Sequence, residues 1–180
     1  TKNVTVLLSG EGSDELMGGY VQHFNQAFKM KNKHFIHLMS KFPLKGEKIK
    51  SQYLPHIPEE DYFIKYRAAI PLNEFENFKP NANLETIWEQ RKKLYSTNQC
   101  RLAQIRYYDM KTWLVNILNL QDKMTMAHSI ENRVPFLDKN LINFVFSQSS
   151  DFFVKSPQNP LKYNSPNKNT KILLKELANK

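Results

Sequence analysis

The sequence predicts an α/β fold in which this chain is mostly α-helical and has one core strand near residues 4–8. The strand is indicated by Val4–Leu8, a continuous β-branched and aliphatic run that is typical of a parallel strand buried on both faces. Four of the five glycines follow within ten residues, at positions 10, 12, 18 and 19. Helices are indicated by apolar residues that recur at helical spacing along much of the remaining chain.

A parallel strand needs neighbours in its sheet, and no later segment repeats an aliphatic run that ends in a glycine turn. We therefore expect the other strands of the sheet to precede Thr1. The opening residues, TKNVTVLLSG, contain no initiator Met and no basic leader followed by an apolar stretch. The sequence is thus expected to be part of a longer one.

Composition limits the class of protein. The chain has 180 residues, of which 41% are hydrophobic, and it carries 26 Lys and Arg against 17 Asp and Glu, a net charge of +9. This length fits one globular domain or a large part of one. A single Cys cannot form a disulfide framework or a cysteine-based zinc site, and no apolar run approaches the roughly 20 residues that a membrane helix needs.

The first helix is expected over Asp14–Phe28, because apolar residues recur every four positions on one face. Five prolines between residues 43 and 80 predict short helices and turns there. From about Leu84 to Leu120 the helical pattern returns and predicts the longest helix of the chain. The residues of the first helical face are Leu16, Tyr20, Phe24 and Phe28.

The C-terminal third is expected to alternate connectors and helices. Residues 121–137 predict a loop or short-helix connector that ends near Pro135. Asp138 predicts a helix N-cap. Residues 155–169 contain three prolines and predict a solvated loop, and a final helix is expected over about 168–179. The expected buried face of the helix after Asp138 is Leu141, Ile142, Phe144 and Val145.

The turn SGEGSDE between the strand and the first helix predicts an anion-binding site, because glycines let backbone amides approach a ligand. It is neither a Walker A loop nor a dinucleotide-binding fingerprint. Its carboxylates Glu11, Asp14 and Glu15 would repel bare phosphate, which favours a bridging Mg²⁺. One carboxylate could instead hold or deprotonate an amine nucleophile. The structural alternative is that Asp14 caps the helix and Glu15 lies in its first turn.

Two sequence blocks resemble one enzyme family. LSGEGSDELMGGY, residues 8–20, resembles the loop after a central strand in the synthetase domain of glutamine-hydrolysing asparagine synthetases. QDKMTMAHSIENRVPFLD, residues 121–138, resembles a later signature of that family, in the same order and at about the same separation. The resemblance implies a cytoplasmic enzyme of ATP-pyrophosphatase fold, with a doubly wound parallel sheet. Residues 1–180 would be the C-terminal half of its synthetase domain.

The resemblance also implies a reaction. ATP would adenylate the side-chain carboxylate of aspartate with Mg²⁺ present, pyrophosphate would leave, and ammonia from glutamine would attack the acyl group. Ser9 and Gly10 would contact the AMP portion of the nucleotide. Glu11 would act in acyl transfer as a base or electrostatic partner for ammonia, and Asp14 would help to hold Mg²⁺ and pyrophosphate. Glu15 matches the motif but receives no assigned role.

Other charged residues of the second block are expected to form a scaffold near the site. They are Asp122, Glu131, Arg133 and Asp138. The family's first phosphate loop, of Ser-Gly-Gly-x-Asp-Ser type, does not occur here, and the Gly18–Gly19 pair is expected inside a helix. The glutaminase domain with its N-terminal Cys is also missing, so both parts are expected upstream. Cys100 is expected to be a small core residue.

A family lysine in a Lys-x-x-Phe stretch would lie after Lys180, and neither Lys171 nor Lys175 is expected to replace it. Because half of the nucleotide site is expected outside it, the chain is expected to be inactive alone. The resemblance also implies two partners, the glutaminase domain of the same parent chain and a second copy in a homodimer. Two alternatives stay open: a related synthetase or amidotransferase, such as a β-lactam-forming or sugar-directed enzyme, and a basic nucleic-acid-binding module. The second is disfavoured because the Lys-rich stretches 29–50 and 155–180 carry no nucleic-acid-binding motif. No zinc is expected from the five histidines.

Overall fold

The structure is a computed structural model that describes residues 4–39, 41, 83–95, 100–155 and 169–180. The chain divides into two compact units, residues 1–31 with 99–180, and residues 32–98. The second unit includes α3 (Lys33–Met39) and α7 (Leu84–Tyr95). The proline-rich stretch 43–80 and most of the expected loop 155–169 lie outside the described residues.

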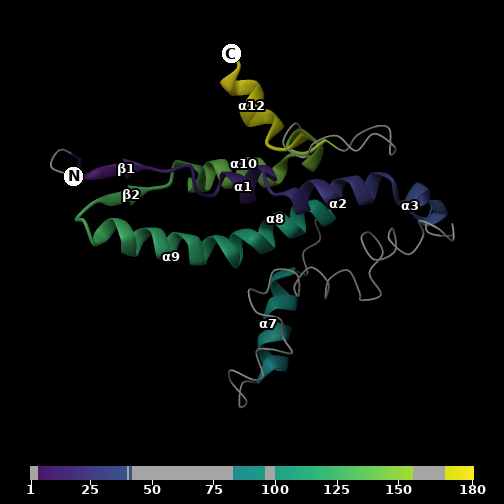
Figure 1. The fold of residues 1–180 in the computed structure, drawn as a ribbon, viewed down its shortest axis with the longest axis horizontal. Coiled ribbons are helices and arrows are strands. Elements are labelled where there is room, and N and C mark those ends of the chain that lie inside the picture. The colour runs from purple at the N-terminus through teal and green to yellow at the C-terminus, as the bar shows by residue number, and fades with distance from the viewer. Residues whose placement is uncertain (1–3, 40, 42–82, 96–99, 156–168) are drawn as a thin grey trace. The chain divides into compact units, whose positions relative to one another are not determined.

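The expected strand is present as β1 (Val6–Leu8), and it pairs in parallel with β2 (Glu131–Arg133), as Figure 1 shows. The register places Val6 opposite Glu131 and Leu8 opposite Arg133. The second strand was not expected, because its polar residues lie within the predicted connector 121–137. The described chain is thus mostly helical with a two-stranded parallel sheet.

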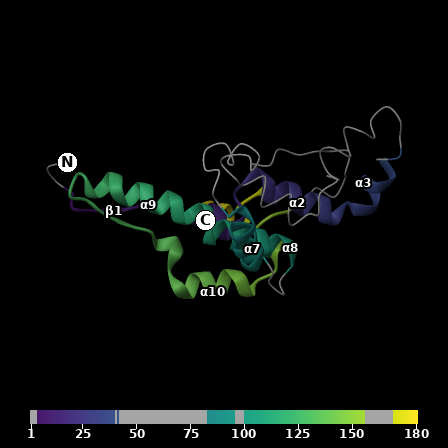
Figure 2. The same cartoon turned by 90° about the horizontal axis from the view of Figure 1, so that it is seen from below.

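The prediction that the first strand is buried on both faces is wrong for this chain. Leu8 is 72% exposed and Val6 is 39% exposed. Within the described residues β1 has one neighbouring strand, β2. The helix α9 (Trp113–Met126) contacts β2 and runs alongside the strands in the views of Figures 1 and 2. A strand with so few neighbours keeps much of its aliphatic surface in water.

The predicted helix over 14–28 is two helices, α1 (Ser13–Met17) and α2 (Val21–Lys31). Gly18 ends α1 in the left-handed region, with φ of 67°, so the prediction that the glycine pair lies inside a helix is wrong. A Cβ on Gly18 would lie 2.4 Å from Val154 Cγ2, which also requires glycine there. Three of the four residues of the predicted apolar face are nevertheless buried, Leu16, Phe24 and Phe28, whereas Tyr20 is half-buried.

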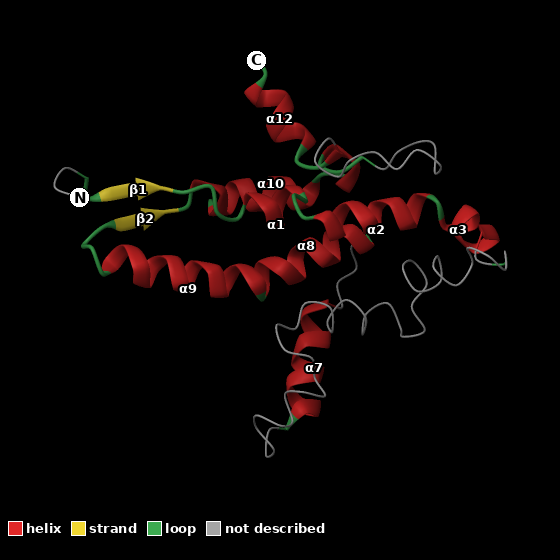
Figure 3. Cartoon of the chain, viewed as in Figure 1, coloured by secondary structure: helices red, strands yellow, loops and turns green. Residues whose placement is uncertain are grey.

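The predicted helix over 84–120 is likewise divided, into α7, α8 (Arg101–Lys111) and α9, as Figure 3 shows. Thr112 separates α8 from α9 with non-helical backbone angles, and its Oγ1 donates a hydrogen bond of 2.8 Å to the Tyr108 carbonyl. The last of the three helices continues to Met126, beyond the predicted end, and is the longest helix among the described residues.

The N-cap prediction at Asp138 is confirmed. Its Oδ1 accepts hydrogen bonds from the backbone amides of Asn140, at 2.9 Å, and Leu141, at 3.0 Å, at the start of α10 (Lys139–Ser147). Val145 is buried as predicted, but Phe144 is 52% exposed and does not belong to the buried face. The remaining elements are the 3₁₀ turns η1 (Pro135–Leu137) and η2 (Ser150–Phe152) and the helix α12 (Ile172–Ala178).

The core surrounds α1, which contacts α8, α10 and α12. Cys100 does not belong to this core: its side chain is exposed and its Sγ lies 3.2 Å from Ser150 Oγ. No helix in the described ranges is long and apolar enough to cross a membrane. The core cluster comprises Leu16, Met17, Phe24, Leu102, Val145, Phe153 and Val154.

Candidate functional site

The two sequence blocks meet at one place, the turn of residues 9–14 that joins β1 to α1, which we call the acidic turn. The Ser9 amide donates a hydrogen bond of 2.9 Å to the Arg133 carbonyl, and its hydroxyl lies 3.5 Å from Asn132 Nδ2. The start of the turn is therefore held against β2, which comes from the second block.

The first two glycines of the turn differ in their surroundings. A Cβ on Gly12 would lie 2.5 Å from Leu137 Cδ2, and Gly12 has a φ of 85°, so this position requires glycine for both space and conformation. A Cβ on Gly10 would have no atom within 4 Å. The turn is thus packed at Gly12 and open at Gly10, where the backbone can meet a ligand.

The carboxylates Glu11 and Asp14 are both accessible. Glu11 is half-buried and forms no hydrogen bond or ion pair within the part of the chain that the structure describes. Asp14 is 40% exposed and forms an ion pair of 2.9 Å between its Oδ1 and Lys171 Nζ. Asp14 does not cap α1, since Gly12 is the N-cap and no side-chain cap bond forms. The capping alternative for Asp14 is therefore wrong.

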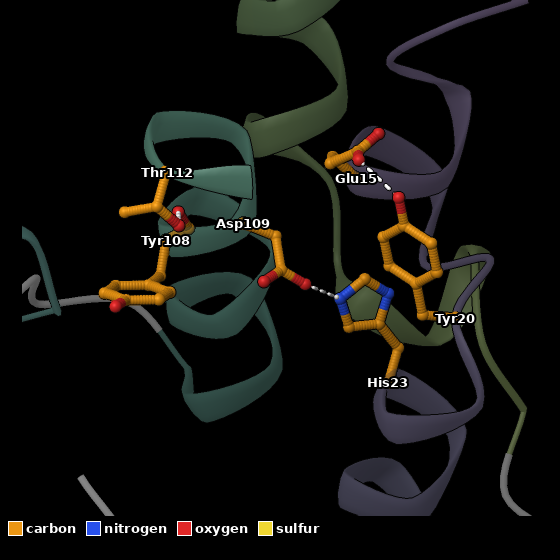
Figure 4. A network of polar contacts seen from close by, with 6 residues as sticks. All are labelled: Glu15, Tyr20, His23, Tyr108, Asp109 and Thr112. Carbon is orange, nitrogen blue, oxygen red and sulfur yellow. Dashed lines mark hydrogen bonds and ion pairs between the residues drawn. The ribbon is translucent and has the colours of Figure 1, made fainter. Parts of the chain in front are cut away.

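Glu15 behaves differently from its two neighbours. It is 1% exposed, and Figure 4 shows its carboxyl group facing Tyr20, whose hydroxyl donates a hydrogen bond of 2.5 Å to Oε1. Desolvation raises the pKa of Glu15 above its ordinary value, although the hydrogen bond from Tyr20 opposes this. The sequence placed Glu15 in the first turn of a helix but could not reveal its burial.

A second buried polar pair lies beside Glu15 and Tyr20. His23 Nε2 and Asp109 Oδ2 are 2.9 Å apart, and both side chains are fully buried. The rings of His23 and Tyr20 are 5.4 Å apart, which links the two pairs in Figure 4. Sequence reasoning missed this network, although a polar residue within the apolar stripe of each helix was a usable signal. The network joins α1, α2 and α8 behind the acidic turn.

The expected charged scaffold is only partly formed. Arg133 Nε lies 2.9 Å from Glu131 Oε1, but both side chains are more than half exposed, so this is a surface pair. Asp138 acts as a helix cap, and Asp122 is exposed. Arg106 is also buried near the core, and its guanidinium carbon lies 5.1 Å from the centroid of the Phe146 ring and 4.6 Å from that of the Phe153 ring. Burial lowers the pKa of Arg106 to about 10.

The acidic turn fits Mg²⁺ only together with a phosphate ligand. The described residues contain no group of three side chains suited to holding a metal. Mg²⁺ commonly binds one or two carboxylates and completes its shell with substrate phosphates and water. Asp14 offers one such carboxylate, and its ion pair occupies Oδ1 and leaves Oδ2.

Comparisons with known proteins show the family of the chain. A family model described as asparagine synthase matches residues 1–180. The chain is 31% identical to asparagine synthetase (glutamine-hydrolyzing) 1 of Bacillus subtilis strain 168, over 98% of this chain and 28% of that protein. It is 35% identical to a putative asparagine synthetase (glutamine-hydrolyzing) of Mycobacterium tuberculosis strain H37Rv, over 76% of this chain and 23% of that protein. No solved structure matches significantly.

The chain spans about a quarter of the length of these curated relatives. The family match nevertheless covers both signature blocks and the elements between them. This chain belongs to the asparagine synthase family.

Proposed function

We propose that the acidic turn is the acyl-transfer part of an ATP-dependent amide-forming site. The reaction converts aspartate to asparagine through a β-aspartyl-AMP intermediate, with ammonia from glutamine. The observation that supports this most is the accessible carboxylate of Glu11, which has no partner among the described residues and follows the open Gly10 at the carboxyl end of β1. Ligands of open α/β sheets bind at such strand ends.

Each accessible residue of the turn has a role in this proposal. The backbone at Ser9 and Gly10 contacts the AMP portion, because Ser9 is fixed to β2 and nothing covers Gly10. Glu11 accepts a proton from the attacking ammonia or stabilises its developing positive charge. Asp14 holds Mg²⁺ through its carboxylate. A Mg²⁺ ion held there would supply positive charge to stabilise the pyrophosphate leaving group.

We propose that the first phosphate loop and the glutaminase domain belong to the remaining length that the relatives have. The 180 residues alone are then inactive. Ammonia would come from the glutaminase domain of the same parent chain.

The test is Glu11→Gln in the full-length protein that contains this chain. Amide formation should fall about 100-fold or more, because general acid–base groups typically contribute 10²–10⁴-fold. ATP binding and aspartate-dependent exchange of pyrophosphate into ATP should stay close to those of the unsubstituted protein, because both precede acyl transfer. Glu85→Gln, on the exposed side of α7, is the matched control and should change neither activity.

Equal losses of exchange and amide formation in Glu11→Gln would contradict the acyl-transfer role. Exchange that depends on an acyl substrate other than aspartate would favour the related amidotransferase or β-lactam-type enzyme instead. The exchange assay therefore separates the acyl substrate from the role of Glu11.

A further inference from the structure

The ammonium group of Lys171 binds two side chains of the acidic turn. Its Nζ lies 2.9 Å from Asp14 Oδ1 and 3.0 Å from Ser13 Oγ. Ser13 is buried, and Lys171 is 158 residues away from it in the sequence. Lys171 therefore joins the turn to the C-terminal part of the chain, a contact that was not predicted from the sequence.

The backbone at Lys171 has an uncommon conformation for a side chain with a Cβ. Its φ and ψ are 50° and 40°, in the left-handed region that favours glycine. The neighbouring backbone holds it there, since the Ile172 amide donates to the Phe153 carbonyl at 3.1 Å and the Lys155 amide donates to the Asn169 carbonyl at 3.0 Å. Phe153 is fully buried, so the segment that carries Lys171 is anchored to the core.

Gly19 supplies a third, independent observation. A Cβ at this position would lie 1.7 Å from Asp14 Oδ1 and 2.4 Å from Lys171 Cε. Its backbone does not need the conformational freedom of glycine, because Gly19 is not among the residues with positive φ. Glycine is therefore needed at position 19 to leave room for the ion pair itself.

We propose that Lys171 is a positioning residue for Asp14, an inference that rests on the proposed function. The ammonium holds Oδ1 and thereby fixes the carboxylate with Oδ2 left for a divalent cation that is also bound to pyrophosphate. An ion pair with 23% and 40% exposed side chains contributes little to stability. Stability alone therefore does not explain why Lys171 adopts a left-handed backbone conformation, or why position 19 is a glycine that leaves space for the ion pair.

The test measures binding of Mn²⁺, as a paramagnetic substitute for Mg²⁺, to the full-length protein in the presence of pyrophosphate. Lys171→Met should weaken Mn²⁺ binding about tenfold, as the loss of a residue that orients a metal ligand typically does. Lys171→Arg keeps the charge and should restore most of the affinity. Lys175→Met is the matched control, because Lys175 Nζ donates a hydrogen bond of 2.6 Å to the Thr170 carbonyl, and it should leave Mn²⁺ binding unchanged.

A double substitution separates positioning from a merely structural role. Asp14→Asn should itself weaken Mn²⁺ binding, and Lys171→Met should then add less than about twofold, because its effect passes through Asp14. A tenfold loss in both backgrounds would overturn the proposal. Gly19→Ala, which displaces the pair and removes neither charge, should reproduce the loss seen in Lys171→Met.

Lys171→Gly tests whether a loss of Mn²⁺ affinity could come from misfolding, because glycine adopts the left-handed backbone conformation of position 171 without steric cost. This variant should melt at or above the temperature of the unsubstituted protein and still lose Mn²⁺ affinity. Unchanged affinity in Lys171→Gly would overturn the positioning role alone. Failure of the unsubstituted protein to bind Mn²⁺ with pyrophosphate would overturn the metal-binding role of Asp14 and this inference with it.

Discussion

Asp14 and Glu15 are consecutive in the sequence, but the carboxylate of Asp14 is accessible and that of Glu15 is buried. The difference depends on the tertiary contacts of each side chain. Asp14 faces Lys171 and remains accessible, whereas Glu15 is buried beneath the turn against Tyr20. The residue types in the turn were enough to predict a site for charged ligands. They could not distinguish the accessible carboxylates from the buried one, because Lys171 and Asp109 reach this region from far along the chain.

The buried carboxyl of Glu15 should make stability depend on pH. Its pKa is raised in the folded protein, so the folded state holds the proton more tightly than the unfolded state. The contribution of this carboxyl group to the free energy of unfolding is therefore greatest at a pH below 4.5, the ordinary pKa of Glu. This contribution falls as the pH rises from 4.5 through the raised pKa of the folded protein. Glu15→Gln should remove this fall. In urea unfolding, the free energy of unfolding of Glu15→Gln minus that of the unsubstituted chain should therefore increase with pH.

Tyr20→Phe provides the opposing variant for the same measurement. The hydroxyl of Tyr20 lowers the pKa of Glu15, so its removal should raise that pKa further and steepen the fall. A stability difference between Glu15→Gln and the unsubstituted chain that stays constant across the titration would rule out the desolvated carboxyl as its source.

At the scale of elements, apolar periodicity located the buried faces better than the helix ends. The face of Leu16 and Phe24 was predicted and is buried, because the same side chains fill the core whether the backbone is one helix or two. The breaks at Gly18 and Thr112 depend on local conformation that the periodicity does not record. The second strand, Glu131–Arg133, could not be predicted, because its three residues are polar and lack the apolar pattern of a core strand.

The break between α1 and α2 should be sensitive to one methyl group. Gly18→Ala places a Cβ in the left-handed region, at roughly 1–2 kcal/mol. It also crowds Val154, and overpacking of a core typically costs about 1–3 kcal/mol. The free energy of unfolding should therefore fall by about 2–5 kcal/mol. Gly10→Ala is the matched control, because its Cβ meets no atom within 4 Å and should change stability by less than about 0.5 kcal/mol. Similar decreases in the free energy of unfolding of the two variants would show that neither the backbone conformation of Gly18 nor its packing against Val154 requires glycine.

At the scale of the molecule, the family is established while the activity is proposed. The family match covers the whole chain, but the chain spans about a quarter of the relatives' length. Near α1 and α12 the acidic turn is fixed by packing of Gly12 against Leu137 and by the ion pair between Asp14 and Lys171. At Gly10 it is open, as expected for a site completed by other residues.

The exposed strand β1 gives the last prediction. An isolated two-stranded sheet is marginally stable in water, and each aliphatic side chain that becomes fully buried contributes roughly 1.5–3 kcal/mol. The exposed side chains of Val6, Leu7 and Leu8 therefore favour coverage by further strands of the full-length protein. Amide hydrogen exchange should then be slower for β1 in the full-length protein than in the 180-residue chain. The amides of α10, which includes the fully buried Val145, should exchange at similar rates in both and serve as the internal control. Equal exchange of β1 in the two proteins would mean that its aliphatic surface stays in water and that the predicted parallel sheet does not extend across it.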